Sequence, residues 1–160
     1  MADAGDNINN PETIEREYPS RPIASTAAYV FRDGKILLAK RGNQPGKGLW
    51  SVPGGAIELG ETVHQAARRE VREECNIEIQ VEKLFNVVDV IMPGENERIK
   101  FHYVIIYLLA RYLGGEPTPG SDALAVCWAS YRELDNLNMI PVIRKNIKQA
   151  FDTAQESSLI

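Results

Sequence analysis

Three glutamates have the spacing that brings carboxylates together. In a helix, residues at i, i+3 and i+4 share a face, so Glu70, Glu73 and Glu74 would converge on one side. Like charges at this spacing repel one another, so the carboxylates must either face solvent or bind cations. Hard carboxylate oxygens favour Mg²⁺, Mn²⁺ or Ca²⁺ over zinc. Taken alone, such a triplet is more often a solvated acidic face than a metal site.

The residues around the triplet favour the metal site. Gly54 and Gly55 lack side chains, which permits close approach of a ligand to the backbone and lets main-chain carbonyls join a metal shell. Glu61 falls just before the helix, and Arg69 lies four residues before Glu73, where it can neutralise or orient carboxylates. The sequence therefore predicts a divalent-cation site between a glycine corner and a helix.

The segment from Gly55 to Ile77 resembles the Nudix box. That pattern is G-x5-E-x7-R-E-U-x-E-E-x-G-U, with U an aliphatic residue, and the chain supplies Gly55, Glu61 and the run from Arg69 to Ile77 in the same order. One defined position differs, because Asn76 stands where the family has glycine. That position follows a helix end, and asparagine is the next most tolerant residue of the left-handed geometry used there. We therefore expect the turn to be kept.

The resemblance implies a metal site and a reaction. The implied ligands are box carboxylates and one main-chain carbonyl, those of Glu70, Glu73, Glu74 and Gly54. The implied catalytic residues are the same Glu70 and Glu73 with Arg69 and Glu61 in support. Bound Mg²⁺, with Mn²⁺ as a substitute, would neutralise charge on a pyrophosphate while water attacks phosphorus. The general base stays open between Glu73, Glu116 and Asp122, since the family takes it from the box or from a downstream loop.

Three residues outside the box are candidate substrate contacts. Arg41 ends a predicted strand and could reach a phosphate, although an exposed strand-end arginine is an equal interpretation. Trp50 could stack on a base, although a large aromatic at a strand start is more often core. Pro93 falls sixteen residues after Ile77, close to where ADP-ribose-cleaving relatives often carry a proline, although an ordinary turn also explains it.

The resemblance also implies a substrate class. ADP-ribose or a similar nucleotide sugar is the first expectation, and a nucleoside triphosphate or oxidised nucleotide is the alternative. A homodimer is possible, as in the ADP-ribose-cleaving members. A nucleotide-sensing module without activity should have lost box carboxylates or gained a DNA-binding domain, and the chain retains all three glutamates. RNA decapping would require a basic channel, which the acidic composition disfavours.

The elements that must position these residues can be outlined from the pattern. Thr62 is a plausible N-cap for a helix over Val63 to Cys75, with Val63, Ala67 and Val71 as its apolar stripe. Pro53, Gly54 and Gly55 are interpreted as a break before it. A second helix, opened by a proline, is predicted over Pro141 to Ala154. The predicted strands are Ile23 to Phe31, Ile36 to Lys40, Trp50 to Val52, Ile77 to Val90, Ile99 to Tyr112 and a buried strand Leu124 to Ala129. With the family resemblance, these elements imply a Nudix-type α/β/α sandwich with a mixed β-sheet.

Length and composition limit the function further. The chain has 160 residues, of which 44% are hydrophobic, enough for one core. We expect one domain over residues 21–155 after a flexible tail over residues 1–20. The net charge of −4 disfavours nonspecific binding to nucleic acid and favours a small nucleotide. Cys75 and Cys127 lack a metal-binding or disulfide pattern, and neither a signal peptide nor a membrane span is indicated, so we expect a cytoplasmic protein.

Overall fold

A mixed β-sheet forms the centre of the protein. The structure is a computed structural model, and it describes residues 15–120 and 122–160. The strands are β1 (Ile23–Arg32), β2 (Lys35–Arg41), β3 (Trp50–Ser51), β4 (Gly54–Ala56), β5 (Glu78–Pro93), β6 (Ile99–Gly114) and β7 (Ala123–Ser130). The helices are α1 (Val63–Cys75) and α2 (Pro141–Glu156), with short 3-10 turns at Glu95–Glu97 and Glu133–Asn136. No helix in these described ranges is long and apolar enough to cross a membrane.

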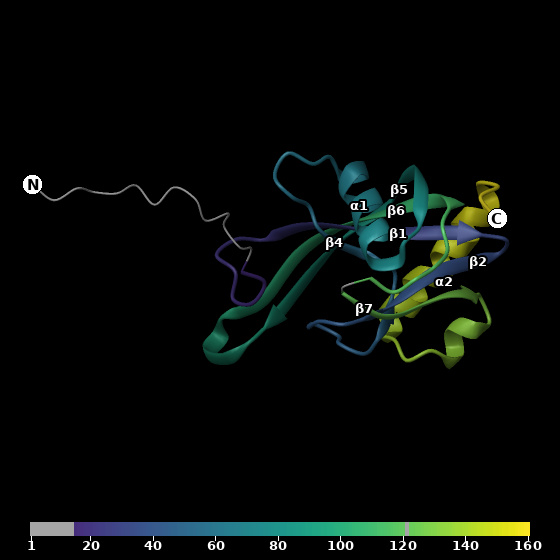
Figure 1. Ribbon diagram of the computed structural model, residues 1–160. Helices are drawn as coiled ribbons and strands as arrows, with labels where there is room; N and C mark the ends of the chain where they lie inside the picture. Colours follow the sequence, from purple (N-terminus) through teal and green to yellow (C-terminus); the bar gives the residue numbers. More distant parts are fainter. Residues whose placement is uncertain (1–14, 121) are drawn as a thin grey trace, which may run out of the picture.

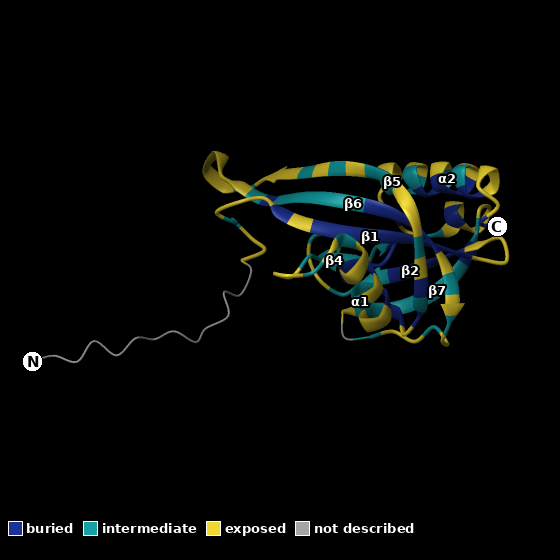
Figure 2. Ribbon diagram, turned by 90° about the horizontal axis from the view of Figure 1, so that it is seen from above, coloured by how far each residue is buried: buried dark blue, intermediate teal, exposed yellow. Residues whose placement is uncertain are grey.

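The strand order confirms the predicted sandwich. The strands run β3-β2-β1-β6-β5, with β4 beside β1 and β7 beside β2. The central pair β1–β6 is parallel, and the other pairs are antiparallel. Figure 2 shows α1 and α2 on opposite sides of this sheet.

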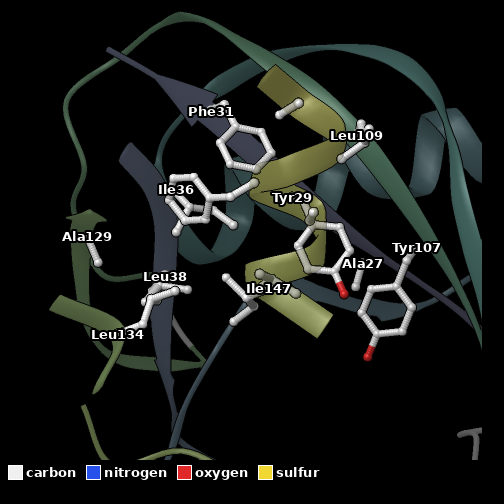
Figure 3. Packing of buried hydrophobic residues seen from close by; sticks show 14 of the residues in the cluster. Ala27, Tyr29, Phe31, Ile36, Leu38, Tyr107, Leu109, Ala129, Leu134 and Ile147 are labelled. Carbon is white, nitrogen blue, oxygen red and sulfur yellow. The ribbon is translucent and has the colours of Figure 1, made fainter. Parts of the chain in front are cut away.

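The central strand β1 divides the core into two parts. Because successive side chains of a strand point to opposite faces, Tyr29 and Phe31 pack on the side of α2, whereas Ala28 and Val30 pack on the side of α1. On the α2 side, Phe31 meets Phe151 edge to face at 5.1 Å between ring centroids. Figure 3 shows this cluster around the helix. Burial of a side chain such as Val30 or Phe31 stabilises the fold by about 1.5–3 kcal/mol. Packing on both faces therefore holds β1 firmly in place.

The neighbour of β1 changes along its length. Its last residues, Phe31 and Arg32, pair with β2, whereas Ser25, Thr26 and Ala27 pair with β4. The strands β2 and β4 therefore lie beside different parts of the same strand edge. This divergence opens the sheet between the β2–β3 pair and the β1–β4 pair.

The β5–β6 hairpin extends beyond the rest of the sheet, as Figure 1 shows. The segment before β1 lies against it, since Tyr18 donates its N–H to the Lys100 carbonyl at 2.8 Å and Arg98 stacks over the Tyr18 ring. Residues 1–14 of the expected tail lie outside the described residues. At the other end, Leu159 is buried, so the packed chain extends past residue 155.

Two sequence expectations about strands were wrong. Gly54–Ala56 is a strand rather than a break, because its backbone pairs with β1 and glycine is the residue that fits there. A Cβ atom on Gly54 would meet the backbone of Thr26 and Ala27 at less than contact distance. The strand β7 was expected to be buried, but Leu124 is 55% exposed. Because β7 pairs only with β2, it is an edge strand, and its outer side chains meet solvent.

Helix α1 begins and ends where the sequence predicted. Thr62 forms a capping box with Gln65, since each side chain accepts a hydrogen bond from the other residue's main-chain N–H. Asn76 follows the helix in the left-handed conformation, with φ 57° and ψ 35°. Its side-chain Nδ2 donates to the Glu116 carbonyl at 3.1 Å, which ties the helix end to the loop before β7.

Replacement of Asn76 tests this helix end. We predict that Asn76→Ala lowers the free energy of unfolding by about 1–3 kcal/mol. Alanine is strained in the left-handed backbone conformation, and it loses the hydrogen bond to the Glu116 carbonyl. Asn76→Gly should cost less, since glycine removes the backbone strain while losing the same bond. Urea unfolding of the two variants measures the difference. Equal losses for both variants would contradict the role given to the left-handed backbone.

Candidate active site

Helix α1 carries one apolar face and one acidic face. Ala66, Ala67, Val71 and Cys75 are buried against the sheet. The apolar stripe expected from the sequence is therefore found at Ala67 and Val71, whereas Val63 is only half-buried. The three glutamates at positions 70, 73 and 74 line a cavity beside this buried face. Small apolar side chains therefore hold the helix against the sheet, and its carboxylates line the adjoining cavity.

The cavity has a volume of about 570 Å³ and lies where the sheet opens beside β1. This volume is in the range of roughly 300–1,000 Å³ that is usual for small-molecule sites. Its walls come from β1, β2 and the loop that follows it, β3, β4, the β5–β6 hairpin, α1 and the start of α2. A second hollow of about 420 Å³, near Tyr131 and Phe151, has Asp152 as its one acidic lining residue. The chemistry-bearing residues therefore gather in the first cavity.

Arg69 organises the acidic end of the cavity. Its guanidinium binds both carboxylate oxygens of Glu61, at 2.7 and 3.0 Å. The same group donates to Glu70 at 2.8 Å, to Glu73 at 3.2 Å and to the Ala56 carbonyl at 3.0 Å. The hydrogen bond from Arg69 holds the pKa of Glu61 below its usual value. The Arg69 guanidinium thus connects β4, the loop before α1 and the helix itself.

Glu70 and Glu74 lie deeper than Glu73. Burial raises the pKa of Glu70, although its bond to Arg69 opposes the shift. Burial and the nearby Glu70 charge raise the pKa of Glu74 to about 8, against a hydrogen bond from the Gly54 N–H at 3.2 Å that lowers it. Asp122 adds a further negative charge that raises the pKa of both groups. The cavity therefore concentrates more negative charge than Arg69 neutralises.

A divalent cation fits this donor set. Carboxylate oxygens are the ligands that Mg²⁺ and Mn²⁺ prefer, and a cation between Glu70 and Glu74 would relieve the repulsion that raises their pKa values. Gly55 leaves the space that the Glu70 carboxylate occupies, since a Cβ atom there would collide with it. Glu70 and Glu73 share the Arg69 guanidinium as their hydrogen-bond partner, whereas Glu74 accepts from the Gly54 N–H. Among the described residues, no three acidic, histidine or cysteine side chains form a ready-made metal cluster. Glu70, Glu73, Glu74 and the Gly54 carbonyl would hold the cation, which would supply positive charge at this end of the cavity.

The candidate substrate contacts divide into two groups. Arg41 and Trp50 line the cavity, and the Arg41 Nε is held by a hydrogen bond to the Pro45 carbonyl at 2.7 Å. Trp50 also packs against the α2-side core, so both interpretations of it apply. Pro93 is exposed at the end of β5 and is not among the lining residues, so its contact with substrate stays a prediction.

The three candidate general bases also separate. Glu73 and Asp122 line the cavity, whereas Glu116 is exposed and is not a lining residue. Asp122 is fixed on the rim by two bonds, because its main-chain carbonyl accepts from the Gly42 N–H and its carboxylate accepts from the Asn43 side chain. Two carboxylates therefore remain in reach of a ligand in the cavity.

The sequence analysis missed the apolar half of the cavity. This half is formed by side chains of the β5–β6 hairpin and of the segment that enters α2, namely Val90, Met92, Tyr103, Ile105, Tyr107, Ile140, Val142 and Ile143. In sequence these residues look like ordinary strand and helix positions. No local pattern in the sequence marks them, because they come together only through strand pairing and packing.

Metal-free protein should lose stability as pH rises because of Glu74. Its unfolded pKa is near 4.5 and its folded pKa is about 8, so its contribution is fully present below pH 4.5 and is lost as pH rises to 8. We expect wild-type protein in a chelator to lose up to about 1.4 kcal/mol per pH unit relative to Glu74→Gln across this window. Urea unfolding of both proteins at several pH values measures it. Parallel pH profiles would contradict the assignment.

Comparisons with known proteins place the chain in a family. A family model described as NUDIX domain matches residues 21–151. An ADP-ribose pyrophosphatase from Methanocaldococcus jannaschii is 36% identical over 116 residues, which cover 72% of this chain and 64% of that protein, less than two thirds of its length. A putative 8-oxo-dGTP diphosphatase 2 from Mycobacterium tuberculosis is 30% identical over 119 residues, 74% of this chain and 80% of that protein. The crystal structure of a MutT NUDIX hydrolase from Burkholderia pseudomallei has 33% identity and a TM-score of 0.65, and it covers 81% of this chain and 98% of that chain. The chain therefore belongs to the NUDIX domain family.

Proposed function

We propose that this protein is a metal-dependent pyrophosphohydrolase that acts on a nucleoside diphosphate linked to a second group. The observation that carries the proposal is one continuous cavity with two chemically different ends. One end holds Glu70, Glu73 and Glu74, and the other is walled by apolar and aromatic side chains such as Tyr103 and Ile105. A nucleotide has the same division, with charged phosphates at one end and a flat base at the other.

The residues of the chain would act mainly by binding and orientation. Arg41, which also lines the cavity, would hold a phosphate oxygen. Arg69 would keep Glu70 and Glu73 in place, because its guanidinium already bonds to both. Glu73 or Asp122 would accept the proton of the attacking water. A divalent cation held by the box carboxylates and the Gly54 carbonyl would supply the positive charge that neutralises the pyrophosphate.

ADP-ribose or a similar nucleotide sugar is the substrate that we propose first. A relative that is named an ADP-ribose pyrophosphatase supports this choice, and Mg²⁺ is the proposed cofactor, with Mn²⁺ as a substitute. A relative that is named for 8-oxo-dGTP supports the alternative, a nucleoside triphosphate or oxidised nucleotide. Either substrate places a pyrophosphate at the carboxylates, so they differ in what fills the apolar end.

The hairpin supports a proposal about assembly. Val87 and Ile91 are 54% exposed on the edge strand β5, and Leu84 is 57% exposed. An edge strand with several exposed apolar side chains is suited to pairing with another chain. We therefore propose a homodimer through the hairpin, which would also bring Pro93 toward the partner molecule.

A hydrolysis screen tests the substrate class. The panel contains ADP-ribose, nucleotide sugars, dinucleoside polyphosphates, NADH and nucleoside triphosphates with their oxidised forms, each with and without Mg²⁺. We expect Mg²⁺-dependent release of AMP from ADP-ribose, measured by chromatography. Release of pyrophosphate from triphosphates instead would select the alternative. A folded protein inactive on the whole panel would favour a nucleotide-sensing role.

Glutamate variants test the site. Glu73→Gln and Glu74→Gln remove a carboxylate while barely changing helix propensity, so we expect kcat to fall about a hundredfold or more with the fold retained. Glu78→Gln is the matched control, because Glu78 follows the same helix but pairs with Arg72 away from the cavity. Turnover equal to wild type in both site variants under limiting Mg²⁺ would refute the assignment.

A further inference from the structure

Ser25 is buried in the cavity wall without a hydrogen-bond partner. Its residue is 5% exposed, it belongs to the cavity lining, and its hydroxyl makes no hydrogen bond within the protein. Two other buried polar atoms share this property in the part of the chain that the structure describes, on Asn86 and Trp128, and neither residue lines either of the two cavities described above. A buried hydroxyl without a partner is costly and calls for an explanation. Ser25 is therefore the orphaned polar group that a ligand could satisfy.

The next residue, Thr26, shows that a buried hydroxyl on this strand can find a hydrogen-bond partner within the protein. Thr26 is 1% exposed, and its Oγ1 donates to the Ile106 carbonyl of β6 at 3.1 Å. Ser25 is on the same strand with the same neighbouring strands, β4 and β6. The difference is the face, because successive side chains of β1 point to opposite sides of the sheet. The unsatisfied hydroxyl lies on the side of α2.

Strand register places Ser25 among the apolar residues of the cavity. In the parallel pair β1–β6, Ile23 lies beside Tyr103, Ser25 beside Ile105 and Ala27 beside Tyr107. Paired residues of neighbouring strands share a face, so these six side chains form one surface. Ser25 is the one residue that places a hydroxyl at the centre of this surface. The two tyrosines carry their hydroxyls at the far end of a ring. Any polar atom of a ligand against the middle of this surface would meet Ser25.

The same register gives Ser25 a position between the two ends of the cavity. Ala27 pairs with Gly54, the glycine that donates to Glu74 at the acidic end. Ser25 lies two residues before Ala27, about 7 Å along β1. Ile23, with Tyr103 beside it, lies about 7 Å beyond Ser25 in the same direction. Starting from the acidic end, the order along β1 is therefore the carboxylates with the Tyr107 ring beside Ala27, then the Ser25 hydroxyl, and then the Tyr103 ring. In a nucleotide the order is phosphate, ribose and base.

We propose that the Ser25 hydroxyl hydrogen-bonds to a hydroxyl of the ribose that joins the phosphate to the base. This proposal rests on the proposed function, because it assumes a nucleotide with its phosphates at the carboxylates. A ribose hydroxyl is neutral and both donates and accepts, as the serine hydroxyl does, so the pair satisfies both groups. Ser25 is then a residue that selects ribonucleotides over deoxyribonucleotides. It favours ADP-ribose over a deoxynucleoside triphosphate as the substrate.

Equilibrium binding tests the proposal without requiring turnover. The ligands are AMP, 2′-deoxy-AMP and 3′-deoxy-AMP, titrated with Mg²⁺ into wild type, Ser25→Ala and Thr26→Val by calorimetry. We expect wild type to bind AMP about five- to tenfold more tightly than one deoxy form, which is the loss of one neutral hydrogen bond. Ser25→Ala should lose this preference by binding AMP more weakly. Thr26→Val should keep the preference.

Thermal unfolding of the free proteins gives a second readout. Ser25→Ala should melt at the same temperature as wild type or higher, because it removes an unsatisfied buried hydroxyl. Thr26→Val should melt lower, because it removes a satisfied bond. A lower melting temperature for Ser25→Ala together with an unchanged ribose preference would overturn the proposal. So would equal weakening of AMP and both deoxy forms, which would assign Ser25 to the base, or failure of wild type to bind AMP.

The two proposals fail in different ways. Absence of hydrolysis across the substrate panel would reject the proposed function, while the binding series could still show a ribose preference that depends on Ser25. Hydrolysis of ADP-ribose by a wild type that does not distinguish AMP from its deoxy forms would leave the proposed function intact and reject the role of Ser25. With active protein, kcat/KM for ADP-ribose and its deoxyadenosine analogues provides the same comparison.

Discussion

The bonds made by the Arg69 guanidinium are the interaction on which the rest of the site depends. They reach Glu61, Glu70, Glu73 and the Ala56 carbonyl, so one side chain holds a loop, a strand and a helix in fixed relation. Several carboxylates in a half-buried cavity would otherwise repel one another and separate. A planar group with five N–H donors is suited to this task in a way that lysine is not. The fold can therefore keep an acidic cluster intact at one end of a ligand cavity.

The cavity itself results from the way the sheet is built. Because β1 pairs with β2 at one end and with β4 at the other, the sheet opens beside its most buried strand. The two glycines of β4 let the backbone approach both β1 and the Glu70 carboxylate. Rigid elements thus surround an opening that is charged on the α1 side and apolar on the α2 side. A ligand with the same two-part character gains contacts from both halves of the protein.

Local signals in the sequence predicted the acidic half of the site well. The N-cap at Thr62, the glutamate spacing and the left-handed turn at Asn76 each depend on near neighbours in the chain, and the structure has the same helix bounds. The short strand Gly54–Ala56 was missed, because its pairing with β1 is a long-range contact that overrides the turn preference of glycine. Ser25 and Tyr103 were missed for a similar reason, since only the parallel pairing of β1 and β6 brings them onto one surface.

The proposed function requires that water attack the phosphorus of a pyrophosphate bound in the cavity. A reaction of the Mg²⁺-loaded protein with ADP-ribose in isotopically labelled water, followed by mass spectrometry of the products, tests it most directly. We expect AMP and ribose 5-phosphate, with a single labelled oxygen in the phosphate of one of them. Label on a sugar carbon instead, or intact ADP-ribose after incubation with folded protein, would contradict the account.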